Sequence, residues 1–347
     1  MSRTTKRSGA TIKDVAERAS VSQMTVSRVL NNKPLVSEAT RERVRAAMRE
    51  LNYRPNLMAR SLAGRSGLFI GLLYANPSYG YLSEFLMGGL EACRRMGHYL
   101  VVEEPFMREE AIDLDQLEDR FIDTSIQAVL VIPPLSDDPD LIEKLTGAGM
   151  DFVRVSASPE PDPAHPTLGI DDRAAAADMT RHLVGLGHER IGVIGGPPSH
   201  IASQLRFEGF CDAMMAAGLD VDAGLIAEGD FTYRTGMEGA ARLLSRKAPP
   251  TAIFAFNDDM ASGAITSAYR AQLEVPRDVS IVGFDDTVNA ASLYPPLTTV
   301  RQPIREMAGR AIEMLMRSVE APGEVPEPLF LDYEIVERAS SGPPGPA

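Results

Sequence analysis

One predicted helix near the amino terminus carries residue types that can read DNA bases. Gln23, Met24 and Arg28 lie on one side of this helix, and Val26 and Val29 lie on the other. An arginine can donate two hydrogen bonds to O6 and N7 of guanine, whereas a methionine can only contact a thymine methyl group. The pattern predicts that the polar side enters the major groove; a merely solvated helix face is the alternative for Met24 and Arg28.

Other polar residues of this segment can contact phosphates or base edges, which fixes the register of a protein on DNA. They are Thr11, Ser22, Thr25, Ser27 and Asn31. Residues 1–65 contain 14 Lys and Arg against 5 Asp and Glu, a net charge of +9, whereas the other 282 residues carry −22 of the overall −13. The amino-terminal end therefore suits nucleic acid, and the rest of the chain repels it.

Short helices joined by tight turns must position these side chains. The apolar periodicity predicts helices over 12–19, 23–31 and 38–51. Thr11, Ser22 and Ser37 stand where the side-chain oxygen of an N-cap residue accepts from the first turn. Pro55 interrupts the third helix, and we expect a linker with a short helix of its own to follow.

From residue 67 onward, apolar strand-like runs alternate with amphipathic helices in two successive series. The helices are predicted at 82–97, 111–122, 139–148, 173–187, 202–217, 233–246, 259–272 and 303–318. This alternation is typical of parallel α/β sheets. Two such units predict two lobes, with a ligand crevice between the carboxyl ends of their strands.

The predicted boundaries follow from these patterns. They are 1–53 for the helix-turn-helix domain, 54–66 for the linker, 67–338 for the two-lobed domain and 339–347 for a disordered tail. Within the two-lobed domain, lobe 1 is expected to comprise 67–165 and 303–325, and lobe 2 to comprise 166–297 and 326–338.

The run TIKDVAERASVSQMTVSRVLNN, with NYRPN and ARSLAG after it, resembles the DNA-binding start of the lactose/galactose repressor family. The resemblance extends over nearly the whole chain. It implies an all-α helix-turn-helix domain joined to a two-lobed, periplasmic-binding-protein-like α/β domain with parallel sheets. It also implies that Gln23 and Met24 select the base sequence, and that Leu62 of two paired linker helices enters the minor groove and bends the duplex.

The same resemblance implies a ligand site. Residues that match family positions for ligand binding are Arg206, Phe231, Asn257, Asp285 and Gln302. From their place after the first strand, Tyr79, Tyr81 and Phe85 are expected to form the opposite wall. Asn257 as a helix cap, Asp285 as a turn residue, and the two tyrosines as a lid surface are the alternatives. The mixture favours a sugar over a nucleobase.

We expect no enzyme, because no phosphate loop, nucleophile elbow or zinc-binding HExxH motif occurs in the sequence. No metal or cofactor site is predicted, since the two cysteines form no CxxC pair and the five histidines lack metal-ligand spacing. The start lacks a signal-peptide core, and no run of 18 apolar residues predicts a membrane span. A cytoplasmic location is expected.

These features together predict a transcriptional regulator that acts as a repressor. It is expected to bind pseudo-palindromic operator DNA as a homodimer and to respond to a small-molecule effector. The carboxyl terminus lacks a leucine heptad, which favours a dimer over a tetramer. The alternative is a two-lobed sugar-binding protein of the transport type without a DNA function. An architectural nucleoid protein fits poorly, since most of the chain is an acidic body.

Overall fold

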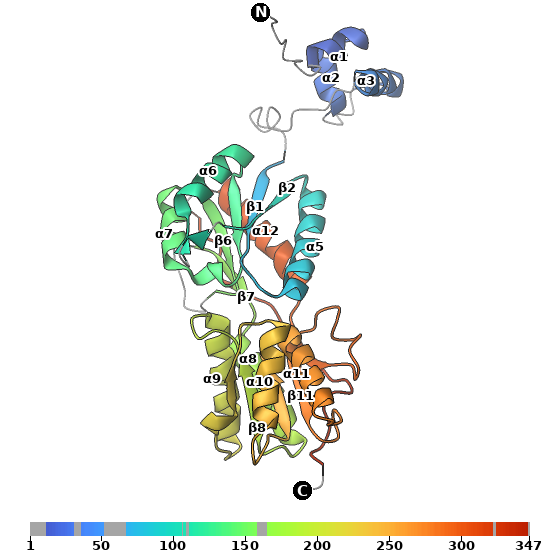
Figure 1. The fold of residues 1–347 in the computed structure, drawn as a ribbon. Helices are drawn as coiled ribbons and strands as arrows, with labels where there is room; N and C mark the ends of the chain where they lie inside the picture. Colours follow the sequence, from blue (N-terminus) through green and yellow to red (C-terminus); the bar gives the residue numbers. More distant parts are fainter. Residues whose placement is uncertain are drawn as a thin grey trace, which may run out of the picture. The chain divides into compact units, whose positions relative to one another are not determined.

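The computed structural model describes residues 12–30, 36–51, 67–105, 107–108, 111–157, 165–321 and 324–345. The chain divides into two compact units, residues 1–66 and residues 67–347 (Figure 1). The described part of the first unit is helical, and the second contains two six-stranded sheets.

The first unit packs three helices around a small apolar core. They are α1 (Ile12–Arg18), α2 (Gln23–Leu30) and α3 (Glu38–Glu50). Val15, Val26 and Val44 are fully buried where the helices meet. Two of the predicted caps are confirmed, because the Thr25 amide donates to Ser22 Oγ at 3.1 Å and the Thr40 amide donates to Ser37 Oγ at 3.3 Å.

Lobe 1 is built on a sheet with the strand order β13-β7-β6-β5-β1-β2, all parallel. Its strands are β1 (Phe69–Leu73), β2 (Tyr99–Glu103), β5 (Ala128–Val131), β6 (Asp151–Val155), β7 (Thr167–Gly169) and β13 (Leu329–Phe330). Its helices are α5 (Tyr79–Met96), α6 (Leu114–Thr124), α7 (Pro139–Gly147) and α12 (Ile304–Glu320). A small hairpin joins β3 (Met107–Arg108) to β4 (Ala111–Ile112).

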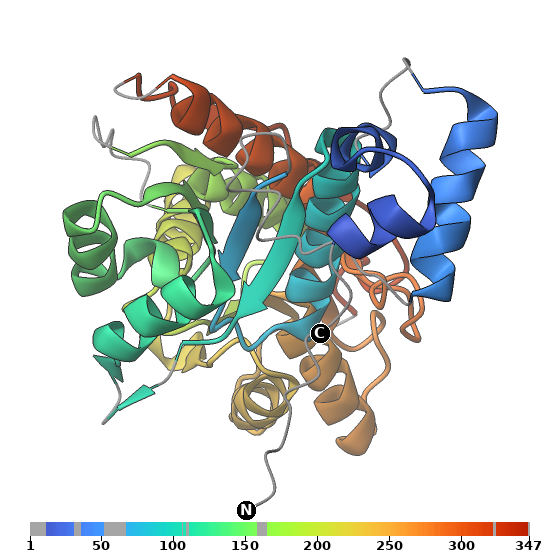
Figure 2. The ribbon, with the colours of Figure 1, turned by 90° about the horizontal axis from the view of Figure 1, so that it is seen from above.

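Helices cover both faces of this sheet. Helices α5 and α12 pack against each other and bury Ile70 and Leu72 on one face, and Figure 2 shows them side by side. Helices α6 and α7 bury Leu73, Val129 and Val131 on the other face. Successive residues of β1 and β5 thus point to opposite apolar layers, as expected for a sheet that is buried on both sides.

Lobe 2 repeats the arrangement with the order β14-β12-β11-β10-β8-β9, in which only β14 is antiparallel to its neighbour. Its strands are β8 (Ile191–Gly195), β9 (Ile226–Glu228), β10 (Ala252–Ala255), β11 (Ser280–Asp285), β12 (Thr298–Arg301) and β14 (Glu334–Val336). Its helices are α8 (Asp172–Gly185), α9 (Ile201–Ala216), α10 (Tyr233–Leu244) and α11 (Asp258–Arg270), with α8 against α9 and α10 against α11.

The predicted lobe boundaries need correction at both crossing strands. The run TLG at 167–169 was expected to open lobe 2, and 326–338 was expected to lie entirely in lobe 2. Instead, β7 pairs with β6, and β13 pairs with β7, so both belong to the lobe 1 sheet. The chain changes lobe after β7, after β12 and after β13. Very short strands carry no pattern that assigns them to one sheet, which explains the error.

The predicted disorder of the tail is wrong for residues 339–345. Ser340 is fully buried, and its Oγ donates to the Ile281 carbonyl at 2.6 Å and accepts from the Thr298 amide at 2.8 Å. The Ile281 amide donates to the Ser340 carbonyl at 2.8 Å. His188 Nε2 lies 2.9 Å from the Gly342 carbonyl. Composition suggested disorder, but backbone groups of β11 and β12 bind this segment.

Deleting residues 339–347 should lower the stability of lobe 2, because the buried Ile281 and Thr298 amides lose their acceptors. A buried polar group left unpaired costs about 1–3 kcal/mol, and about 1 kcal/mol shifts the melting temperature by roughly 2–4 °C in a domain of this size. We expect a decrease of about 5–15 °C by calorimetry. A control chain that ends at Pro344 keeps these bonds and should melt like the full chain; equal melting temperatures for both truncations would contradict the assignment.

Candidate functional site

Helix α2 separates an apolar face from a polar one, as a DNA-reading helix must. Val26 and Val29 are buried, whereas Gln23 and Arg28 are exposed and the Met24 side chain is 64% exposed. The exposed residues occupy the first two turns of the helix. Among the described residues of the first unit, none covers this face, which is therefore available to a partner.

The other predicted DNA contacts are only partly described. Ser22 is exposed, and its Oγ lies 2.9 Å from Thr25 Oγ1, so these hydroxyls cap α2 as well as being candidates for phosphate contact. Ser27 is half-buried and has a polar partner. Thr11, Asn31 and Leu62 lie outside the described residues.

A pocket lies where the two sheets of the second unit end. It is lined by residues that end a strand, follow one or belong to the next helix, namely Asn76, Ser78, Tyr81, Pro133, Ser156, His200, Ala202, Arg206, Phe231, Asn257, Asp285 and Gln302. These positions come at or after the ends of β1, β5, β6, β8, β9, β10, β11 and β12. Parallel strands bring their carboxyl ends to one edge, which explains why residues more than 200 positions apart meet here.

The pocket has little free space. Its free volume is about 30 Å³, enough for only one or two water molecules. Ser78 Oγ, at the start of α5 in lobe 1, donates to Asp259 Oδ2 in the first turn of α11 in lobe 2 at 2.7 Å. Burial raises the pKa of Asp259. A sugar-sized molecule can enter only if the lobes move apart.

Six of the predicted ligand residues line the pocket: Tyr81, Arg206, Phe231, Asn257, Asp285 and Gln302. The prediction that Tyr79 and Phe85 form its wall is wrong. The Tyr79 residue is 80% exposed in the first turn of α5, and Phe85 is fully buried one helical turn beyond Tyr81, on the side that faces the core. Phe85 shares the helix face of Tyr81 and is kept from the pocket by its place one turn further along α5, whereas Tyr79 points to the exposed side.

Arg206 is held rigidly inside the pocket. It is only 5% exposed, and its Nε donates to Asp172 Oδ1 at 2.8 Å. Its Nη1 donates to the Phe256 carbonyl at 2.5 Å, and its guanidinium lies 3.6 Å from the centroid of the Phe284 ring. Asp171 caps α8, and Asp172 is the buried counter-ion of Arg206.

Asn257 and Asp285 are partly committed to the protein itself. Asn257 Oδ1 accepts from the Met260 amide at 2.8 Å, which confirms the helix-cap alternative, and its Nδ2 donates to the Phe231 carbonyl at 2.9 Å. Asp285 Oδ1 accepts from Gln302 Nε2 at 2.6 Å. Burial raises the pKa of Asp285 well above its usual value, although the positive charge of Arg206 opposes the shift.

Three residues of the pocket have left-handed backbone conformations that side chains other than glycine rarely adopt. The φ angles are +49° at Ser156, +64° at Phe231 and +118° at Asp285. Each such conformation costs on the order of 1–3 kcal/mol and persists only where neighbouring contacts enforce it. Their coincidence at one pocket is typical of a functional site.

Buried polar atoms that the protein leaves poorly paired surround the same space. Among the described residues, His200 Nδ1 is buried and forms no hydrogen bond, and the buried hydroxyls of Tyr81 and Ser156 have no partner beyond each other. Burial, with repulsion from Arg206, lowers the pKa of His200 to about 4, so the imidazole is neutral near pH 7. An unpaired buried polar atom destabilises a protein unless a ligand or water pairs with it.

Sequence reasoning missed half of the lining residues. These are Asn76, Ser78, Pro133, Ser156, His200 and Ala202. Every one of them follows the carboxyl end of β1, β5, β6 or β8. Applying the strand-end rule to every predicted strand would have nominated these loops, but it would not have selected the residues within them.

Two other kinds of site are not seen in the part of the chain that the structure describes. No group of three or more His, Cys, Asp or Glu residues could hold a metal ion there. No helix there has the length and apolar character that crossing a membrane requires.

Two family models match the chain. The model for bacterial regulatory proteins of the lacI family matches residues 11–56, and the model for a periplasmic binding protein-like domain matches residues 180–341. The first match contains all of helix α2, and the second contains Arg206, Phe231, Asn257, Asp285 and Gln302.

Similar proteins cover almost the full length. The chain is 33% identical over 335 residues to the ribose operon repressor of Escherichia coli (strain K12), spanning 96% of this chain and 100% of the relative. It is 34% identical over 341 residues to the transcriptional repressor CytR of Escherichia coli (strain K12), spanning 97% of each.

Solved structures agree. A Lac repressor dimer bound to operator and the anti-inducer ONPF matches with a TM-score of 0.81 and 29% identity, over 96% of this chain and 100% of that one. A complex of the transcriptional regulator CelR with cellobiose matches with a TM-score of 0.73 and 29% identity, over 95% and 99%. With its helix-turn-helix and two-lobed domains both matched, the chain belongs to the lacI family of bacterial regulatory proteins.

Proposed function

We propose that this chain is a transcriptional repressor whose affinity for operator DNA is controlled by a small sugar bound between its lobes. Two copies bind a pseudo-palindromic operator through paired α2 helices, because two-fold symmetry of the protein matches two-fold symmetry of the site. The similarity to repressors along the full chain supports this function. It also leaves the transport-type alternative without support, since such a protein needs no lacI-type segment at residues 11–56.

The observation that carries the effector half of the proposal is the set of poorly paired polar atoms around the pocket. Tyr81 Oη, Ser156 Oγ and His200 Nδ1 can each form a hydrogen bond with a hydroxyl group. The Phe231 ring, the Arg206 guanidinium and the Asp285 carboxyl group line the same space. Many hydroxyl partners with one aromatic face suit a sugar. A relative named for the ribose operon and a structural neighbour that contains cellobiose support this class.

Control of DNA binding follows from closure of the lobes. The effector occupies a space that is now almost filled, so its binding must change the separation of the lobes and the Ser78 to Asp259 contact across them. A movement of lobe 1 relative to lobe 2 is transmitted along the chain to the segment before residue 67 and so to the DNA-binding unit. Such couplings are typically about 1–3 kcal/mol, or roughly 5- to 150-fold in affinity.

The first test is a thermal-shift screen of the full chain against pentoses, hexoses, disaccharides, sugar phosphates and nucleosides. A ligand at 100 times its dissociation constant stabilises the folded state by about 2.7 kcal/mol, which corresponds to a shift of roughly 5–10 °C. We expect a sugar to give the largest shift. A shift with nucleosides alone would remove the sugar assignment, and silence from the whole panel together with no selective DNA binding would contradict the proposal.

Replacing Arg28 with Ala should abolish selective operator binding and leave sugar binding intact. One bidentate contact with guanine contributes about 1–3 kcal/mol of discrimination, and a dimer loses two. We expect at least a tenfold loss of affinity for genomic fragments that the wild-type chain selects, measured by gel shift. Arg43→Ala, on the exposed surface of α3, is the matched control. Equal losses in both variants would indicate a purely electrostatic role for Arg28.

Tyr81→Phe should weaken sugar binding without weakening the fold. The variant removes a buried hydroxyl whose sole neighbouring polar group among the described residues is the Ser156 hydroxyl, so the ligand-free melting temperature should change little. The lost ligand hydrogen bond is expected to reduce affinity about 3- to 10-fold, measured by calorimetric titration with the sugar that gives the largest thermal shift. Tyr99→Phe, on β2 away from the pocket, is the control. An unchanged affinity would remove Tyr81 from the site.

A further inference from the structure

The loop that leads from β9 into α10 holds Phe231 in an unfavourable conformation. The φ angle of +64° at this residue is one that a phenylalanine rarely adopts. Its ring packs edge-on against His200, with the ring centroids 5.0 Å apart, and the residue lines the pocket. Contacts made by neighbouring residues must therefore hold the backbone of Phe231 in this conformation.

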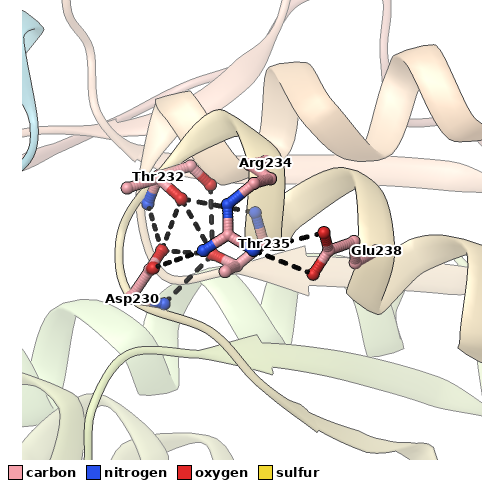
Figure 3. Close-up of polar contacts among 5 residues, drawn as sticks. All are labelled: Asp230, Thr232, Arg234, Thr235 and Glu238. Carbon is pink, nitrogen blue, oxygen red and sulfur yellow. Dashed lines mark hydrogen bonds and ion pairs between the residues drawn. The ribbon is translucent and has the colours of Figure 1, made fainter.

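The contacts on either side of Phe231 converge on one carboxylate. Asp230 Oδ1 accepts from the Thr232 amide at 3.0 Å, from Thr232 Oγ1 at 2.5 Å and from Thr235 Oγ1 at 2.6 Å. The Asp230 amide donates back to Thr235 Oγ1 at 3.1 Å. Thr232 and Thr235 also form the start of α10, since the Thr235 amide donates to Thr232 Oγ1 at 3.3 Å. Figure 3 shows these side chains gathered around Asp230.

The Asp230 carboxylate has a second set of contacts, which involve the exposed side chains of Arg234 and Glu238. Arg234 Nη2 lies 3.3 Å from Asp230 Oδ2, and Arg234 Nη1 lies 3.2 Å from Glu238 Oε1. Burial opposes ionisation of Asp230, but hydrogen bonds from Thr232 and Thr235 outweigh it and hold the pKa of this carboxyl below its usual value. The group is therefore a carboxylate near pH 7 and can accept all of these bonds at once.

We propose that Asp230 is a positioning residue that, through Thr232 and Thr235, fixes the Phe231 ring over the effector pocket. This inference rests on the proposed function of the pocket, because the position of the Phe231 ring affects ligand binding only if this pocket binds the effector. The brace spans the residues immediately before and after Phe231, so its loss leaves the strained backbone without its local contacts, and the hydrogen bond from Asn257 Nδ2 to the Phe231 carbonyl remains. The ring then leaves the pocket wall, while β9 and α10 remain anchored by their own contacts.

The sequence offers a direct probe of the ring position. The chain contains no tryptophan, so Phe231→Trp supplies a single fluorescent reporter at this position. Its emission maximum and its quenching by iodide report burial of the indole without any ligand. In the reporter background, Asp230→Ala should shift the emission to longer wavelength and raise the iodide quenching constant at least twofold. Asp230→Asn, which keeps Oδ1 as an acceptor for both threonines, should restore most of the original emission.

Two further variants separate the brace from general loss of structure. Thr235→Val removes one donor to Asp230 with little change of shape and should give a smaller shift in the same direction. Glu238→Gln is the matched control, because it weakens only the outer contact with Arg234 and should leave the emission unchanged. The far-ultraviolet circular dichroism of every variant should match that of the reporter chain.

The ligand readout uses the sugar panel of the thermal-shift screen on chains with native Phe231. Asp230→Ala should reduce the affinity of the responding sugar about tenfold, leave ligand-free operator binding unchanged and be largely rescued by Asp230→Asn. If Asp230→Ala leaves emission and quenching as they were, the brace does not position the ring and the inference is wrong. If the emission shifts as expected but no sugar binds the wild-type chain, the positioning role stands and the proposed function of the pocket fails.

Discussion

The parallel direction of the strands is the constraint on which the second unit depends. A parallel sheet ends all its strands at one edge, so the loops that leave these ends must meet. Both sheets have the same strand order, and both turn this edge toward the same pocket. Residues as distant as Asn76 and Gln302 become neighbours without any direct pairing of their segments. The pocket is thus a consequence of strand direction, and the side chains of the loops decide its chemistry.

Charge and polarity inside this pocket are arranged at a cost to stability. Arg206 and Asp172 form a buried ion pair, and burial raises the pKa of Asp172 although the positive charge of Arg206 opposes the shift. Tyr81, Ser156 and His200 keep polar atoms poorly paired. A protein selected for stability alone would replace these groups with apolar ones of similar size. Their presence is understandable where a ligand completes the hydrogen bonds, since the poorly paired atoms then favour the ligand that fits them.

The sequence predicted the fold well wherever a periodic pattern was long. Each predicted helix of 8 or more residues has a counterpart in the structure. Burial of one helix face requires apolar residues at intervals of three and four positions, and this spacing is visible in the sequence. It failed where the determining contacts are not local. The runs at β7 and β13 are only three and two residues long, and their place depends on which strand they meet. Ser340 is buried by partners about 40 and 60 residues away, a contact that composition cannot reveal.

The same distinction applies to the site. Resemblance nominated Arg206 and Phe231, whose positions the structure places in the pocket lining, but it could not supply Asp172 as the partner of Arg206 or the left-handed backbone of Phe231. Of the two crossovers next to the pocket, the predicted boundaries placed the first before β7 instead of after it, and the second between 297 and 303, where the chain does pass back. Asp172 begins α8 directly after the chain passes from lobe 1 to lobe 2, and Gln302 lies where the chain passes back after β12.

These crossovers connect ligand chemistry to lobe movement. The three connections between lobes are the segments whose backbone angles must change when the lobes rotate. Asp172 binds Arg206, and Gln302 binds Asp285, so two of the three connections carry a side chain bonded to a charged group of the pocket. Under the proposed function, a ligand that hydrogen-bonds to Arg206 or Asp285 would be separated from a connecting segment by a single side-chain contact.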